Sequence, residues 1–160
     1  MRKRLVSGIC SLVMILGLIF CTGVDAGASD SRPMVDGTYL TQDVESIGTA
    51  TPVTRGEHLQ TGYSKLRRVA DGVIYAGGTT IARHECESIQ VAVLVERARP
   101  DEEEWHYVDS WIHENQNATA ASTSKQLEVE GGWYYRVSCI HTADGDIAQS
   151  STNGLLVPEY

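Results

Sequence analysis

The feature that most constrains the fold of this chain is a run of strict alternation between Ile89 and Glu96. In Ile89-Gln90-Val91-Ala92-Val93-Leu94-Val95-Glu96, every second residue is β-branched. Successive side chains of a strand point to opposite faces, so a period of two places all four β-branched residues on one face. The run therefore predicts a strand that turns one face to a hydrophobic core.

Shorter β-forming runs flank this strand and are separated by turn residues. Gly77-Gly78 and Gly131-Gly132 are expected to end strands, the acidic break 99–104 to form a hairpin loop, and the polar segment 115–123 to form a longer loop. No segment has helical periodicity. The expected strands are residues 63–69, 73–76, 89–96, 105–112, 126–130, 133–141 and 154–157. This pattern predicts an all-β fold, namely an antiparallel β-sandwich that is immunoglobulin-like in architecture.

The first 26 residues have the pattern of a secretory signal peptide. Three basic residues, Arg2 to Arg4, precede an apolar run from Leu5 to Phe20, and Val24-Asp25-Ala26 supplies small residues at the −3 and −1 positions. The run is shorter than the ~20 apolar residues of a spanning helix, which makes an uncleaved anchor the weaker alternative. We therefore expect cleavage after Ala26, no membrane span in the mature protein, and a secreted, extracellular location.

The charge of the mature chain limits its partners. Residues 1–26 hold three of the thirteen basic and one of the twenty-one acidic residues, which leaves ten and twenty and a net charge of about −10. Nucleic acid and anionic membranes are poor partners for such a chain. Its length suits one domain. We expect a polar, extended N-terminal lead-in at residues 27–62 and the β-sandwich domain at residues 63–160.

The mature chain keeps two cysteines, Cys86 and Cys139, in a compartment that permits oxidation. A disulfide between them is the default expectation. His84 and His141 each stand two residues from one of the cysteines, and side chains two apart on a strand share a face. If the two strands were adjacent, these four side chains could hold zinc tetrahedrally. We expect the disulfide and no cofactor, with the zinc site as the alternative.

Aromatic residues are dense between Trp105 and Tyr135. Such residues either pack a core or, when exposed, offer platforms to ligands such as sugar rings. We expect Tyr134, Trp111 and Trp105 to form a binding surface for a cell-surface, glycan or protein partner.

Catalytic motifs are lacking, because the sequence has neither a nucleophile in a glycine-flanked turn nor a dense His/Glu metal motif. Asp144-Gly145-Asp146 lacks the later acidic ligands of a calcium loop and is typical of a turn. We therefore expect a non-enzymatic interaction module. The alternatives are a structural or zinc-binding extracellular domain and a hydrolase with an unrecognised site.

Several short stretches match those of a known family in the same order. They are residues 35–40 (VDGTYL), 75–80 (YAGGTT), 95–97 (VER), 108–111 (VDSW), 129–137 (VEGGWYYRV) and 152–154 (TNG). Over most of its mature length the chain resembles small secreted proteins of Gram-positive bacteria built on a domain of unknown function. The resemblance implies a secreted bacterial origin. It implies no particular activity, and it supplies no catalytic residue.

Overall fold

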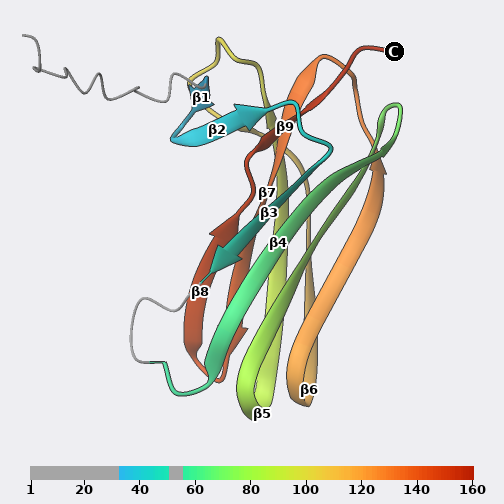
Figure 1. Ribbon diagram of the computed structural model, residues 1–160. Helices are drawn as coiled ribbons and strands as arrows, with labels where there is room; N and C mark the ends of the chain where they lie inside the picture. Colours follow the sequence, from blue (N-terminus) through green and yellow to red (C-terminus); the bar gives the residue numbers. More distant parts are fainter. Residues whose placement is uncertain (1–32, 51–55) are drawn as a thin grey trace, which may run out of the picture. The chain divides into compact units, whose positions relative to one another are not determined.

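The computed structural model describes residues 33–50 and 56–160, and within these ranges it contains nine β-strands and no helix (Figure 1). The strands are β1 (Met34–Val35), β2 (Thr38–Thr41), β3 (Glu45–Ala50), β4 (Leu59–Ala70), β5 (Val73–Ala98), β6 (His106–Glu128), β7 (Trp133–Ala143), β8 (Asp146–Ser151) and β9 (Gly154–Val157). The all-β class expected from the alternation is confirmed. The expected signal peptide, residues 1–26, lies outside the described residues. Among those that are described, no helix is long and apolar enough to cross a membrane.

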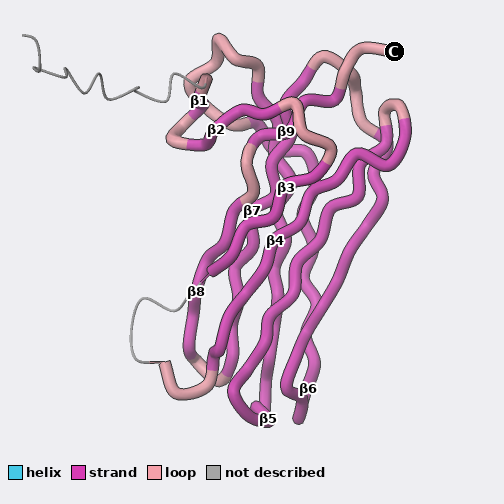
Figure 2. Tube along the Cα trace, in the orientation of Figure 1, coloured by secondary structure: helices cyan, strands magenta, loops and turns pink. Residues whose placement is uncertain are grey.

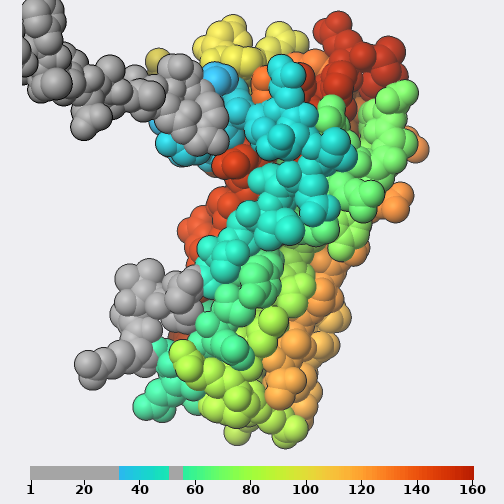
Figure 3. All heavy atoms as spheres, in the orientation of Figure 1, coloured from blue at the N-terminus to red at the C-terminus, as the bar shows by residue number. Residues whose placement is uncertain are grey.

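The strands form one curled sheet. Their order is β1-β2-β9-β7-β5-β4-β3, and β6 and β8 are added beside β5 and β7. The pairs are antiparallel except β2 with β9, where Leu40 and Thr41 lie opposite Gly154 and Leu155 in parallel register. The sheet is therefore mixed rather than purely antiparallel, because β2 runs in the same direction as β9. Figure 3 shows the face on which β3 and β4 lie beside parts of β5 and β6.

The centre of the fold is a long antiparallel ribbon of β5 and β6 that bends over on itself (Figure 2). Residues 73–81 of β5 pair with residues 120–128 of β6, and we call this part the first arm. Residues 86–97 pair with residues 106–118 and form the second arm. Between the arms, residues 82–85 of β5 oppose the single residue Thr119 of β6. β5 therefore bulges around the outside of the bend.

Two positions expected to interrupt strands lie inside them. β5 continues through Gly77-Gly78, where a Cβ on Gly78 would approach Cys139 Sγ to 2.6 Å and Val91 Cγ2 to 2.8 Å. Close packing, rather than a turn, therefore requires a glycine there. The polar segment 115–123, expected as a loop, is the bend of β6, and Asn117 adopts a left-handed φ of 49° in it.

The main core includes the inward residues of the second arm. The four β-branched residues from Ile89 to Val95 are each at most 2% exposed, as the alternation predicted. They cluster with buried residues of β4, β7 and the first arm, among them Leu66, Ile74 and Val137. Burial of these aliphatic side chains supplies the main stabilising free energy, at about 25 cal/mol per Å² of apolar surface.

The polar segment 27–62, expected as an extended lead-in, contributes β1, β2, β3 and the start of β4 to the same compact unit as the rest of the described chain. β3 alternates exposed and buried residues, and its buried positions are Ser46, Gly48 and Ala50. Small side chains suffice here because the strand lies close to β8: a Cβ on Gly48 would overlap the backbone of Ser151. β3 therefore alternates between buried and exposed positions, but its buried residues are too small to be recognised as a hydrophobic pattern in the sequence.

The outer edge of the ribbon is β6, which among the described strands pairs with β5 alone. Its two arms are joined by side chains across the bend. Lys125 Nζ lies 3.0 Å from Asp109 Oδ2, and Trp111 Nε1 donates a hydrogen bond to Thr123 Oγ1 at 3.2 Å. These contacts hold the edges of the two arms together.

Candidate functional site

The two cysteines of the expected disulfide lie far apart. Cys139 of β7 is paired with Val93 of β5, whereas Cys86 comes seven residues before Val93 on that same strand. At about 3.3 Å per residue, the two Cα atoms are separated by roughly 20 Å, and a disulfide needs less than about 7 Å. Both thiols are free and buried in the described part of the chain. The expected crosslink is therefore absent from this structure.

The register between β5 and β7 also separates the ligands of the expected zinc site. His141 is paired with Val91, five residues beyond Cys86 on β5, so Cys139 and His141 cannot share an ion with His84 and Cys86. Cys139 lies in the core, where burial raises the pKa of its thiol to about 12. His84 and Cys86 lie at the bend of β5 instead.

His141 is a buried structural residue. Its Nδ1 lies 2.9 Å from Thr80 Oγ1 and its Nε2 lies 2.8 Å from Ser150 Oγ. The Thr80 hydroxyl donates its one proton to the carbonyl oxygen of Gln90, so it must accept from Nδ1–H, and Nε2 accepts from Ser150. Burial lowers the pKa of His141 to about 4. The ring is therefore neutral near pH 7 and links the first arm, through Thr80, to β7 and β8.

The three expected aromatic ligand-binding residues are placed in two separate groups. Trp105 and Tyr134 pack against the small cluster of Val35, Leu40 and Ala98, and Trp105 Nε1 donates to the Val35 carbonyl oxygen at 3.0 Å. The guanidinium of Arg136 stacks over the Trp105 ring at 4.5 Å.

Trp111, by contrast, lies in the edge strand β6 and packs against the main core, and Lys125 lies over its ring at 4.4 Å. Trp105, Trp111 and Tyr134 therefore do not form one exposed aromatic platform. Each of the three makes packing contacts, and Trp111 also lines the groove described below.

A different surface gathers exposed apolar side chains, on the outward face of the second arm, β7 and β8. Ala92 is paired with Ile112 on one side and Ile140 on the other, and Ile140 is paired with Gln149. Residues opposite one another on paired strands share a face, so these four form a row across four strands. Leu94, Ser110 and Ser138 form the next row.

The two rows line a shallow groove of about 460 Å³. We call its outward-facing residues the apolar groove, and they are Ala92, Leu94, Ser110, Ile112, Ser138, Ile140 and Gln149. The flanking isoleucines are 65% and 51% exposed for Ile112 and Ile140. The small side chain of Ala92 forms the floor between them.

The sequence indicates this groove through the outward-facing positions of the Ile89–Glu96 strand, which an analysis of its buried positions alone does not consider. In the run from Ile89 to Glu96, the residues between the β-branched ones include Ala92 and Leu94. An antiparallel strand with one solvated face normally carries polar residues at such positions. Apolar residues on both faces of a strand indicate either a second buried face or a surface that binds something.

Comparison of the chain with protein families, with curated proteins and with solved structures finds no match in any of the three. The resemblance to small secreted proteins of Gram-positive bacteria stays a prediction.

Proposed function

We propose that the protein is a secreted, non-enzymatic module that binds a protein partner through the apolar groove. One observation carries the proposal: Ile112, Ala92 and Ile140 form a continuous apolar row across three paired strands, and the two isoleucines of this row are exposed. Single exposed apolar residues are ordinary, but a contiguous patch with polar surroundings is typical of an interaction site. None of the seven groove residues is charged, in a chain of which 21% is charged.

The chemistry of the groove favours a protein over a glycan. Sugar rings stack on flat aromatic faces. Trp111 also lines the groove, but it is paired with the buried Val93 and packs against the main core, whereas the outward-facing residues are aliphatic or small and polar. Two isoleucines on either side of an alanine floor leave a slot that accepts an aliphatic side chain of a partner, with Ser110, Ser138 and Gln149 as hydrogen-bonding residues at its margin. We therefore commit to a protein partner that presents an aliphatic side chain.

Export and architecture belong to the same proposal. The pattern of residues 1–26 supports secretion, and the resemblance to secreted Gram-positive proteins supports a bacterial origin and an extracellular location. The two arms of the ribbon, which share one core, support an immunoglobulin-like sandwich architecture. Such a fold exposes outward faces of its sheets to partners.

The test compares groove variants with a matched isoleucine elsewhere. Labelled mature protein, residues 27–160, is titrated onto cell envelopes of Gram-positive bacteria, before and after treatment with protease or with periodate. We expect saturable binding that protease abolishes and periodate leaves intact. Ile112→Glu and Ile140→Glu should each weaken it at least tenfold, whereas Ile47→Glu, on the 56% exposed Ile47 of β3, should leave it unchanged.

Three results would overturn the proposal. Loss with periodate but not with protease would make the partner a glycan. Equal binding by wild type and Ile140→Glu would remove the groove from the interface. Sedimentation velocity supplies the third: a dimer of the wild type that Ile112→Glu dissociates would show that a second copy of this chain occupies the groove.

A further inference from the structure

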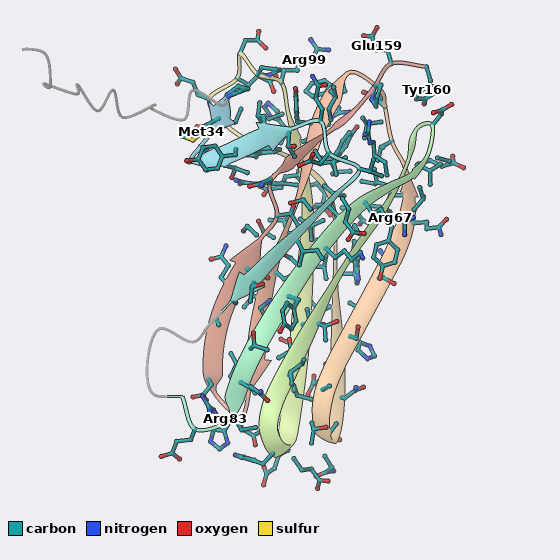
Figure 4. The ribbon with its side chains drawn as sticks, in the orientation of Figure 1. Met34, Arg67, Arg83, Arg99, Glu159 and Tyr160 are labelled. Carbon is teal, nitrogen blue, oxygen red and sulfur yellow. The ribbon has the colours of Figure 1, made fainter. Side chains whose placement is uncertain are left out.

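The bend of β5 brings together three metal-ligating side chains from distant parts of the chain. His58 precedes β4, His84 lies in the bulge of residues 82–85, and Cys86 follows the bulge. One ligand atom of each lies within 4.8 Å of the other two. The rings of His58 and His84 meet edge to face with centroids 5.0 Å apart. Figure 4 labels Arg83, the neighbour of His84, at this end of the molecule.

A fourth ligand comes from the turn between β7 and β8. Asp144 Oδ2 lies 4.0 Å from His58 Nδ1, and the same carboxylate interacts with the Cys86 thiol. The backbone N–H groups of Glu87 and Ser88 donate to its two oxygens at 3.0 and 2.9 Å. Each carboxylate oxygen has a second lone pair, so the group is held in place and can still coordinate a cation.

Two further contacts orient His58 and His84 for metal binding. The Arg83 backbone N–H donates to the carbonyl oxygen of His58 at 2.8 Å, which fixes His58 against the bulge. His84 Nδ1 lies 3.0 Å from the Glu85 carbonyl oxygen, so Nδ1 carries the proton and Nε2 keeps the lone pair that a metal needs.

His58 Nδ1 supplies an independent sign that a ligand belongs here. Among the described residues it is one of two buried side-chain nitrogen or oxygen atoms without a hydrogen-bond partner. A buried polar atom left unpaired costs about 1–3 kcal/mol, and native folds rarely tolerate one without a reason. A cation between His58 and its three neighbours would give this nitrogen its partner.

We propose that His58, His84, Cys86 and Asp144 bind one zinc ion. Two imidazoles, one thiolate and one carboxylate are a donor set that suits zinc, whereas calcium and magnesium require oxygen ligands throughout. Ligand atoms of a tetrahedral zinc site lie about 3.5 Å apart. The ligand atoms of His58, His84 and Cys86 already lie within 4.8 Å of one another, and Asp144, 4.0 Å from His58 Nδ1, would have to turn toward the other two to complete the shell. On binding, the S–H bond of Cys86 breaks, a sulfur–zinc bond forms, and the proton passes to solvent.

The site differs from the one expected from the sequence. His84 and Cys86 keep their expected role, but the partners are His58 and Asp144 rather than Cys139 and His141. Four protein ligands close the coordination shell, which is typical of a structural zinc. The ion would crosslink three segments, namely the residues just before β4, the bend of β5 and the β7–β8 turn. None of the groove residues takes part, so this inference stands independently of the proposed function.

The test uses reduced, chelator-stripped mature protein, residues 27–160, titrated with Co²⁺ and then with Zn²⁺. We expect one ion per chain, a thiolate-to-cobalt charge-transfer band that zinc abolishes, and a higher Tm with zinc. His84→Gln is the main variant because His84 is exposed, so its replacement spares the core. It should weaken zinc binding at least tenfold, while His106→Gln, at another exposed histidine, should not.

The cysteines supply the second comparison. Cys86→Ala should remove the charge-transfer band, and Cys139→Ala, at the buried cysteine of the core, should retain it. If Cys86→Ala is too unstable to purify, the cobalt spectrum of His84→Gln alone decides. A band that persists at wild-type affinity in His84→Gln, or a bound cobalt without any thiolate band in the wild type, would overturn the assignment. Preferential binding of calcium would do the same.

Discussion

Acidification from about pH 7.5 to about pH 4.5 is expected to destabilise the protein through His141. The ring is fully buried between Thr80 and Ser150, and burial lowers its pKa from 6.5 to about 4. Between these two values the unfolded chain binds a proton at this position and the folded protein does not. The stability that the neutral ring contributes is therefore complete above about pH 6.5 and falls as the pH drops toward 4.

The magnitude follows from the size of the shift. At about pH 4.5 the unfolded histidine is protonated and the folded one is mostly neutral, so linkage gives a loss of roughly 2–3 kcal/mol. This is a large part of the 5–15 kcal/mol that stabilises an ordinary domain. With a urea dependence of about 1–3 kcal/mol per molar, the unfolding midpoint should fall by about 1–3 M.

The assay is urea unfolding of the metal-free protein across this pH range, in chelator, with His141→Gln as the matched variant. Glutamine does not titrate, so the variant should lose much of the slope between pH 6.5 and 4.5. Asp144 and Asp146 also have a lowered pKa, since backbone N–H groups donate to both, but their contribution is lost only as the pH falls below about 3.8. Parallel curves for wild type and variant, or an NMR titration that places the pKa of His141 near 6.5, would refute the reasoning.

Three further outcomes are expected. Gly62→Ala should destabilise by about 1–3 kcal/mol in urea unfolding, because the new Cβ would overlap the ring of His141; an unchanged midpoint would contradict this packing. Cys139 should resist iodoacetamide in the native protein and react in urea, because burial raises the pKa of its thiol to about 12. The intact mass of the protein, prepared without oxidant, should correspond to two free thiols. Asp146→Ala should lower Tm, because two backbone N–H donors lose their acceptor; an equal fall with Asp146→Asn would show that the charge matters more than the acceptor.

The parts of the fold that sequence could predict are those set by side-chain periodicity. The strict alternation from Ile89 to Val95 is a local property of one strand, and it located the core correctly. The continuation of β5 through Gly77-Gly78 could not be read in the same way. A glycine pair is compatible with both a turn and a close approach between strands, and only the position of Cys139 in the fold decides between them.

The candidate sites depended on contacts between distant residues and were therefore harder to predict. The β5–β7 register separates Cys86 from Cys139 by about seven residues along the strand, and no property of the neighbouring residues reports that offset. The bulge at the bend brings His84 beside His58, 26 positions earlier in the chain, through tertiary structure alone. Of the four residues that we propose as zinc ligands, His84 and Cys86 follow from the sequence pattern, whereas His58 and Asp144 depend on the fold.

The bend in β6 also limits how another chain could add to the edge of this sheet. Among the described strands, the outer edge of the 23-residue β6 has no partner. Such an edge is a template onto which another chain could add, and repeated addition leads to fibres. The strand changes direction at Asn117, so a straight strand from a neighbour could follow only one arm, about half of that length. The Asp109–Lys125 ion pair places opposite charges where the two arms meet. The bend thus divides one long aggregation-prone edge into two short ones, and no other described strand pairs with either.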